Sequence, residues 1–314
     1  MESPPQGYPP DYPPPPPPPT AEPEAPGYFY APAAPPRPRR SSRTLGTVIA
    51  VIAGVALLLV IAGTYGVAGF YSASSRLSSA NRALQTAVGH RGAFDNAPSI
   101  FEGDASDAKT LQSDAATFTK TWQEQSATIE TDDQALASAA KSLGQQQWLT
   151  LIRRGNMETA SVRITHARKA LDAARTIAAA RVKEGQFQQA LADAISDFDT
   201  LGMDAQNSDF GGAVTAAMKM QTDAGRALTL TGDQQFPSEL HDYMAAVQTL
   251  ASDFVKYLSA VRQGDQTTAK SLIDKANTDL DALGNYDITA IGDKIDQYYQ
   301  PYIDTYHAEL SKAA

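Results

Sequence analysis

Two pairs of carboxylates stand at a spacing that could support chemistry in this chain. Glu130 precedes Asp133 by three positions, and Glu239 precedes Asp242 by three, so each pair would lie on one face of a helix. Paired carboxylates can serve as general acid and base, or bind a hard cation. Acidic residues also favour the first turn of a helix, where the helix dipole stabilises negative charge. We therefore expect each pair to mark the start of a helix, with a ligand or partner surface as the alternative.

A cluster of tyrosines near the C-terminus is the second candidate site. Tyr298, Tyr299, Tyr302 and Tyr306 fall within nine residues. Tyrosine is frequent at interfaces and in ligand clefts, so together with neighbouring aspartates these side chains could line a groove for a cation, sugar or peptide. The same spacing fits the buried face of a helix with the hydroxyl groups at its rim. We favour the core face and keep the groove as the alternative.

The remaining reactive residue types form no recognisable site. Four histidines, His90, His166, His241 and His307, are scattered without metal-ligand spacing. The chain has no cysteine, which excludes disulfides and thiolate metal sites. No glycine-rich phosphate loop follows a strand, and the GxSxG nucleophile motif is absent. We expect no catalytic residue, no metal site and no cofactor, and hence no enzyme.

Charge and composition narrow the class of protein further. The formal net charge is −9, and the excess of acidic residues lies in residues 72–314 because residues 1–44 hold four acids and four arginines. An acidic surface repels phosphate backbones, so no nucleic acid is expected as a partner. The chain lacks both cysteine and an Asn-x-Ser/Thr acceptor. We take this composition as typical of a prokaryotic envelope protein.

The elements that must position these residues begin with a tail and a membrane span. Residues 1–44 are proline-rich up to an arginine cluster and should be disordered. Residues 45–71 contain no charged residue and are long enough to cross the hydrocarbon core. By the positive-inside rule the tail is cytoplasmic and residues 72–314 lie outside. The four arginines that set this orientation are Arg37, Arg39, Arg40 and Arg43.

Small residues recur along one side of the expected span. Such a register allows two membrane helices to approach closely, so a homodimer through this face is one interpretation. The alternative is that the small residues reflect only the general abundance of Gly and Ala in apolar spans. The residues concerned are Gly46, Ala50, Gly54, Ala62 and Gly66.

The part outside the membrane has a helical period and an internal duplication. Laid over residues 210–282 without a gap, residues 101–173 are identical at about 20 of 73 positions. The match is densest between "RRGNMETA" at Arg153 and "RQGDQTTA" at Arg262. We interpret this as two tandem duplicated modules, residues 99–202 and 205–314, preceded by a helical stalk and linker at 72–98. The fold class is all-α: one transmembrane helix and an antiparallel helical bundle.

Glycines mark the expected turns between antiparallel helices. Gly103, Gly155, Gly185 and Gly264 each precede a polar stretch that ends in alanine. A glycine can end a helix in the left-handed conformation, and the next residue, as at Asp265, can cap the following helix. The expected helices cover residues 104–126, 131–153, 157–183 and 187–201, then 212–230, 238–262, 266–283 and 287–311.

These features favour a membrane-anchored, non-catalytic binding or scaffolding protein of the cell envelope. The alternative is an extracytoplasmic ligand-binding sensor that signals through its tail or through a partner. The partner would be an envelope protein or a small ligand, which the sequence does not identify.

Overall fold

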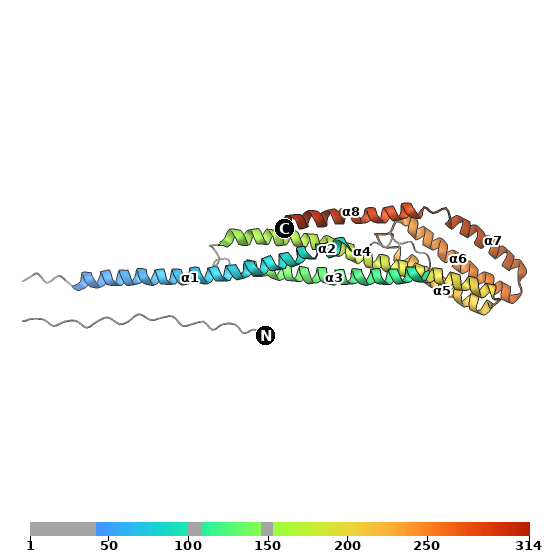
Figure 1. The fold of residues 1–314 in the computed structure, drawn as a ribbon, viewed down its shortest axis with the longest axis horizontal. Helices are drawn as coiled ribbons and strands as arrows, with labels where there is room; N and C mark the ends of the chain where they lie inside the picture. Colours follow the sequence, from blue (N-terminus) through green and yellow to red (C-terminus); the bar gives the residue numbers. More distant parts are fainter. Residues whose placement is uncertain (1–41, 99–107, 146–152) are drawn as a thin grey trace, which may run out of the picture. The chain divides into compact units, whose positions relative to one another are not determined.

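The computed structural model describes the backbone of residues 42–98, 108–145 and 153–314, and the side chains of these residues from 64 onward. Every element in these ranges is a helix, so the all-α expectation is confirmed (Figure 1). The chain divides into two compact units, residues 1–57 and 58–314. The second unit is the helical bundle considered below.

Helix α4 is the centre of the bundle. It packs against α3, α5 and α8, while α6 packs on α5 and α7 packs on α6 (Figure 1). The helices are α1 Ser42–Gly89, α2 Arg91–Asp95, α3 Ala108–Gly144, α4 Arg154–Gln206, α5 Phe210–Leu230, α6 Ser238–Gln263, α7 Gln266–Leu283 and α8 Ile288–Ala313.

The last four helices lie within two residues of the expected bounds. Gly264 ends α6 in the left-handed conformation with a φ of 75°. The side chain of Asp265 accepts a hydrogen bond from the backbone nitrogen of Thr268 and so caps α7. Asp209 and Asp287 cap α5 and α8 in the same way. Glycine and aspartate therefore set these boundaries locally, as the sequence predicts for Gly264 and Asp265.

The expected break between residues 126 and 131 is wrong. Helix α3 runs without interruption from Ala108 to Gly144. In the second expected module, residues 231–237, which align with 122–128, read "TGDQQFP", and Gly232 and Pro237 lie between α5 and α6. The first copy has neither glycine nor proline between residues 108 and 143, so nothing in its backbone ends the helix.

The expected turn at Gly185 is also wrong, because this glycine lies inside the 53-residue helix α4. A β-carbon at Gly185 would collide with the Thr119 hydroxyl and lie 3.3 Å from the Thr119 α-carbon. Gly185 thus allows close packing of α4 on α3.

The other two expected turns in the first module have different outcomes. Gly155 is the second residue of α4 and Asn156 the third, so Asn156 is not the N-cap. That position belongs to Arg153. Gly103 lies outside the described residues.

Residues of both expected modules contribute to a shared hydrophobic core. The larger buried cluster includes Ile164 of α4, Met244 of α6 and Ile295 of α8. A smaller cluster joins the end of α4 to α5, α6 and α7 around Leu201 and Leu258. Helix α4 crosses the expected boundary between the modules.

The segment expected as a stalk is part of the bundle. Five residues of α1 at helical spacing are buried in the larger core cluster: Ala73, Leu77, Ala80, Leu84 and Ala87. Helix α1 ends at Gly89.

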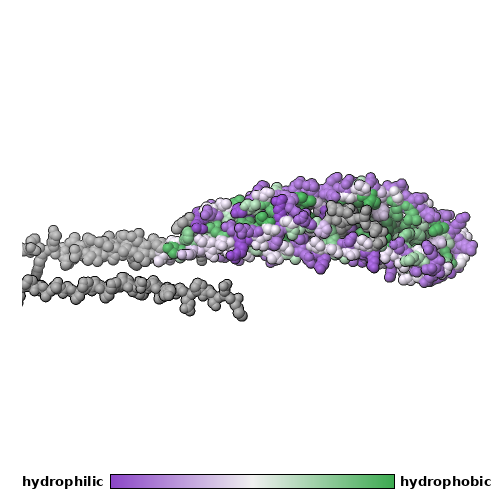
Figure 2. All heavy atoms as spheres, viewed as in Figure 1, coloured by the Kyte–Doolittle hydropathy of each residue, from purple (hydrophilic) through white to green (hydrophobic). Residues whose placement is uncertain are grey.

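The expected membrane span falls mostly outside the described side chains. The tail and its four arginines lie there too, as does the small-residue face except Gly66. Among the residues that are described, no helix is both long enough and apolar enough to cross a bilayer. Hydrophilic residues cover much of the visible face of the described bundle, with hydrophobic residues between them (Figure 2).

Candidate functional site

The tyrosine cluster lies on α8, which packs along α4. Tyr299 and Tyr306 are buried, and Tyr298 and Tyr302 are half-buried. The rings of Tyr298 and Tyr302 are 5.5 Å apart. The tyrosines therefore face the core to different depths.

Tyr299 completes a buried polar cluster with Arg181 and Glu184 of α4. Arg181 Nη1 donates to Glu184 Oε2 at 2.7 Å, and the Tyr299 hydroxyl donates to the same oxygen at 3.0 Å. The guanidinium carbon of Arg181 lies 3.9 Å from the centre of the Tyr299 ring, a cation–π contact. Glu184 and Tyr299 are 0% exposed. The cluster thus ties α8 to α4 through residues 115 positions apart.

The electrostatics of this cluster follow from its burial. Burial raises the pKa of Glu184, and the neighbouring Arg181 opposes that rise. Burial, reinforced by the Glu184 charge, also raises the pKa of Tyr299. Glu184 Oε1 has no hydrogen-bond partner among the described residues, and neither has Gln188 Oε1 or Gln235 Nε2. An enclosed cluster of this kind suits the positioning of helices better than contact with a substrate.

Further along α8, polar contacts join its C-terminal end to α4. Arg163 donates to the carbonyl oxygens of Ala313 and Ala314 at 2.7 and 2.6 Å. His166 Nδ1 lies 2.7 Å from Glu309 Oε2, and this hydrogen bond is the main cause that lowers the pKa of Glu309 to about 2. The C-terminal turn of α8 is therefore held by charge-assisted contacts.

Tyr306 joins α8 to α2. Its ring lies 4.6 Å from the ring of Phe94, which in turn lies 5.6 Å from Trp122 of α3. Burial raises the pKa of Tyr306 to about 12. These aromatic contacts make Tyr306, at the C-terminal end of the tyrosine cluster, part of the core.

The first carboxylate pair lies in the middle of α3 and not at a helix start, so that expectation is wrong for Glu130 and Asp133. Asp133 pairs with Arg168 of α4 at 2.7 Å and with Arg175 at 3.3 Å. Glu130 pairs with Arg175 at 3.3 Å. The hydrogen bond from Arg168 lowers the pKa of Asp133. These carboxylates bridge α3 and α4.

The second pair does mark a helix start. Glu239 lies in the first turn of α6, and Asp242 is exposed one turn later. Glu239 pairs with Lys294 of α8, and this hydrogen bond lowers the pKa of Glu239. The two pairs contact different helices, so the duplication does not bring them into one site.

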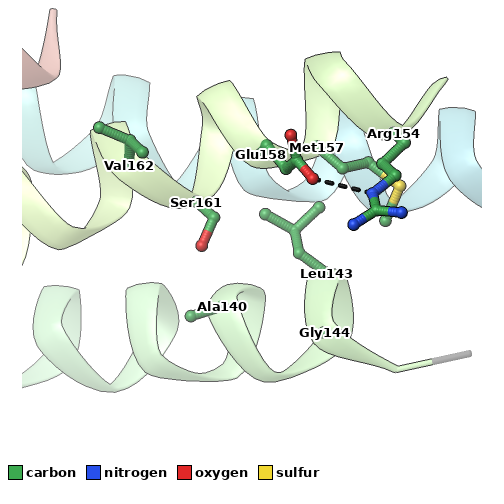
Figure 3. A pocket seen from close by; sticks show the side chains of 8 residues that line it. All are labelled: Ala140, Leu143, Gly144, Arg154, Met157, Glu158, Ser161 and Val162. Atoms are coloured by element: carbon green, nitrogen blue, oxygen red, sulfur yellow. Dashed lines mark hydrogen bonds and ion pairs between the residues drawn. The ribbon is translucent and has the colours of Figure 1, made fainter. Parts of the chain in front are cut away.

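A hollow lies between the end of α3 and the start of α4. The sequence did not predict it, because it forms only where these two helix ends pack together. Its volume is about 260 Å³. Figure 3 shows Leu143 and Ser161 pointing into this space, with the 2.9 Å hydrogen bond from Arg154 Nε to Glu158 Oε1 at one side. The lining residues are Ala140, Leu143, Gly144, Arg154, Met157, Glu158, Ser161 and Val162. The lining combines apolar side chains with the polar groups of Arg154, Glu158 and Ser161.

Within the described ranges, no group of three or more His, Asp or Glu residues is arranged to hold a metal ion. No family model, curated protein or solved structure matches this chain.

Proposed function

We propose that this chain is a single-pass membrane protein whose helical bundle acts outside the membrane as a non-catalytic binding or scaffolding module. The observation that carries the proposal is the continuity of α1, which runs unbroken from Ser42 to Gly89. Residues 44–75 of this helix carry no charge and would extend about 48 Å, more than a bilayer core. Packing into the bundle begins at Ala73, so anchor and bundle would share one helix.

The exposed side chains on the first described part of α1 support a membrane anchor. Tyr65 is 56% exposed, Val67 58% and Tyr71 70%. Large apolar side chains are costly to leave in water, and tyrosine favours the membrane–water interface. Their position at the end of the uncharged segment fits an interfacial belt.

The polar contacts of the bundle support a binding role over an enzymatic one. The buried Glu184 and the paired carboxylate of Asp133 are both engaged in joining helices. The exposed faces of α5 to α7 would be open to a partner of the envelope.

The proposed topology can be tested by cysteine labelling, because the chain has no native cysteine. Ser3→Cys places a thiol in the tail, and Gln263→Cys places one at the exposed end of α6. In intact cells a membrane-impermeant maleimide should label the protein at position 263 at once, and at position 3 only after lysis. The unsubstituted chain is the control for background. Labelling at both positions in intact cells, or loss of the protein from washed membranes, would contradict the anchor.

The continuity of α1 also favours a second candidate, a ligand-binding sensor. A helix that belongs to the bundle core and continues toward the tail could carry a displacement across the membrane. Deleting residues 1–36 should abolish the output of such a sensor while leaving an external scaffold intact. A thermal-shift screen of ions, sugars and peptides gives the complementary test, since a ligand at a hundred times its Kd adds about 2.7 kcal/mol of stability.

A further inference from the structure

The α3–α4 end of the bundle lies beside the point where the uncharged part of α1 ends. The guanidinium carbon of Arg153 lies 4.4 Å from the centre of the Phe70 ring. Arg76 donates to the carbonyl oxygen of Ser142 at 3.2 Å and also to that of Gln145. We call this end the basal surface: residues 70–76 of α1, 142–145 of α3 and 153–158 of α4.

The contact with Phe70 sets the depth of the basal surface. Phe70 and Tyr71 are the last aromatic residues in the uncharged part of α1. In a membrane helix, aromatic side chains at such an end lie at the level of the headgroups. A side chain stacked on Phe70 lies at the same depth. Arg153, together with the neighbouring exposed Arg154, would therefore meet the headgroups directly. This arrangement leaves no length of α1 to act as a stalk.

Charge is distributed unevenly between this end and the rest of the bundle. The basal surface contains three arginines, Arg76, Arg153 and Arg154, and a single acid, Glu158. The rest of residues 72–314 contains nineteen basic and thirty acidic side chains. An anionic surface would attract the basal end and repel the remainder, which orients the bundle.

We propose that the basal surface binds the phosphate groups of anionic phospholipids in the membrane that anchors the chain. Arginine suits this task because its planar guanidinium can hold two phosphate oxygens at once. Arg153 and Arg154 are the principal residues, with Phe70 positioning Arg153. This inference rests on the proposed membrane anchor.

The test uses the full chain in vesicles of phosphatidylcholine with or without phosphatidylglycerol. A fluorophore on Asn156→Cys reports the basal surface, and one on Gln263→Cys reports the far end of α6. A quencher attached to lipid headgroups should quench the probe at position 156 more strongly when phosphatidylglycerol is present. High salt should remove this increase, because the Debye length, over which charges interact, falls to about 3 Å at 1 M salt. The probe at position 263 should show no increase.

The arginines are tested by substitution in the same assay. The double variant Arg153→Gln and Arg154→Gln should return quenching at position 156 to the phosphatidylcholine level. Arg262→Gln, which changes the duplicated counterpart of Arg153 at the exposed end of α6, should leave it unchanged. If circular dichroism shows that the double variant has lost helicity, Arg154→Gln alone is measured in the same quenching assay at low and high salt. Lipid binding then predicts a smaller phosphatidylglycerol-dependent increase for this variant.

Two failures are distinguishable. A chain retained by the vesicles after an alkaline wash, but quenched equally with and without phosphatidylglycerol, would overturn the lipid-binding inference and leave the anchor in place. A chain that the wash removes would overturn the anchor, and the lipid-binding inference with it.

Discussion

Replacing Arg181 with methionine is expected to lower the free energy of unfolding by about 3–5 kcal/mol, because it leaves the carboxylate of Glu184 buried without its cation. Glu184 is 0% exposed, and Arg181 donates to it at 2.7 Å. Methionine retains much of the apolar stem that covers the Tyr299 ring. For a bundle of this size the loss corresponds to a fall in Tm of roughly 6–20 °C, measurable by circular dichroism in detergent.

The control for this prediction replaces the whole cluster with apolar residues. Arg181→Met, Glu184→Leu and Tyr299→Phe together remove the charge pair and the hydroxyl that donates to it. Replacing a buried ion pair by well-packed apolar residues is often neutral, or stabilises the protein by about 1–4 kcal/mol. The triple variant should therefore recover most of the Tm lost on Arg181→Met. If Arg181→Met alone lowered the free energy of unfolding by less than about 1 kcal/mol, the buried carboxylate of Glu184 would not need Arg181 for its stabilisation.

The same cluster has an expected pH dependence. Since burial raises the pKa of Glu184 in the folded state, the folded chain binds this proton more tightly than the unfolded chain. The contribution of Glu184 to stability is therefore greatest below the ordinary pKa of a glutamate, and it falls as pH rises through the raised value. The cost of Arg181→Met should shrink toward low pH, where Glu184 is neutral.

Replacing Gly185 with alanine is expected to destabilise the bundle by about 1–3 kcal/mol through overpacking between α3 and α4. The added methyl group would meet the Thr119 hydroxyl, lie 3.0 Å from Phe118 Cδ1 and approach the backbone at the Thr119 α-carbon to 3.3 Å. The Thr119 side chain can move, but the backbone of α3 must shift. Alanine gains up to roughly 1 kcal/mol over glycine inside a helix, and we expect the net effect to stay destabilising because the backbone of α3 must shift.

Gly202 provides the matched control, because it lies in the same helix with no atom within 4 Å of an added β-carbon. Gly202→Ala should raise the unfolding midpoint in urea slightly, while Gly185→Ala should lower it. Equal changes in the same direction would mean that α3 and α4 do not approach closely at Gly185.

Some of this architecture is determined by local sequence. Helices α5 to α8 have the expected bounds because Gly264 ends α6, Asp265 caps α7, and Gly232 and Pro237 interrupt the chain between α5 and α6. The apolar period within each helix also identifies buried residues such as Trp122 and Phe254. Such signals act within one or two helical turns and need no knowledge of neighbouring helices.

Local sequence signals were misleading in the first expected module. Gly185 and Gly264 carry similar sequence contexts, yet one lies inside a helix and the other ends one. The difference arises from packing: α3 lies against α4 at Gly185, and a turn there would lose that contact. The carboxylates Glu130 and Asp133 likewise find arginines of α4 instead of a helix terminus.

By itself the sequence determined that the described chain is helical, that the C-terminal helices end where they do, and that the tyrosine row has a face directed to the core. Only the tertiary structure decided that α1 belongs to the bundle, that Tyr299 meets Glu184 across 115 positions, and that Arg153 stacks on Phe70. Helix boundaries depend on backbone preferences of neighbouring residues, whereas these contacts depend on which helices pack together. That choice is made by the whole hydrophobic core.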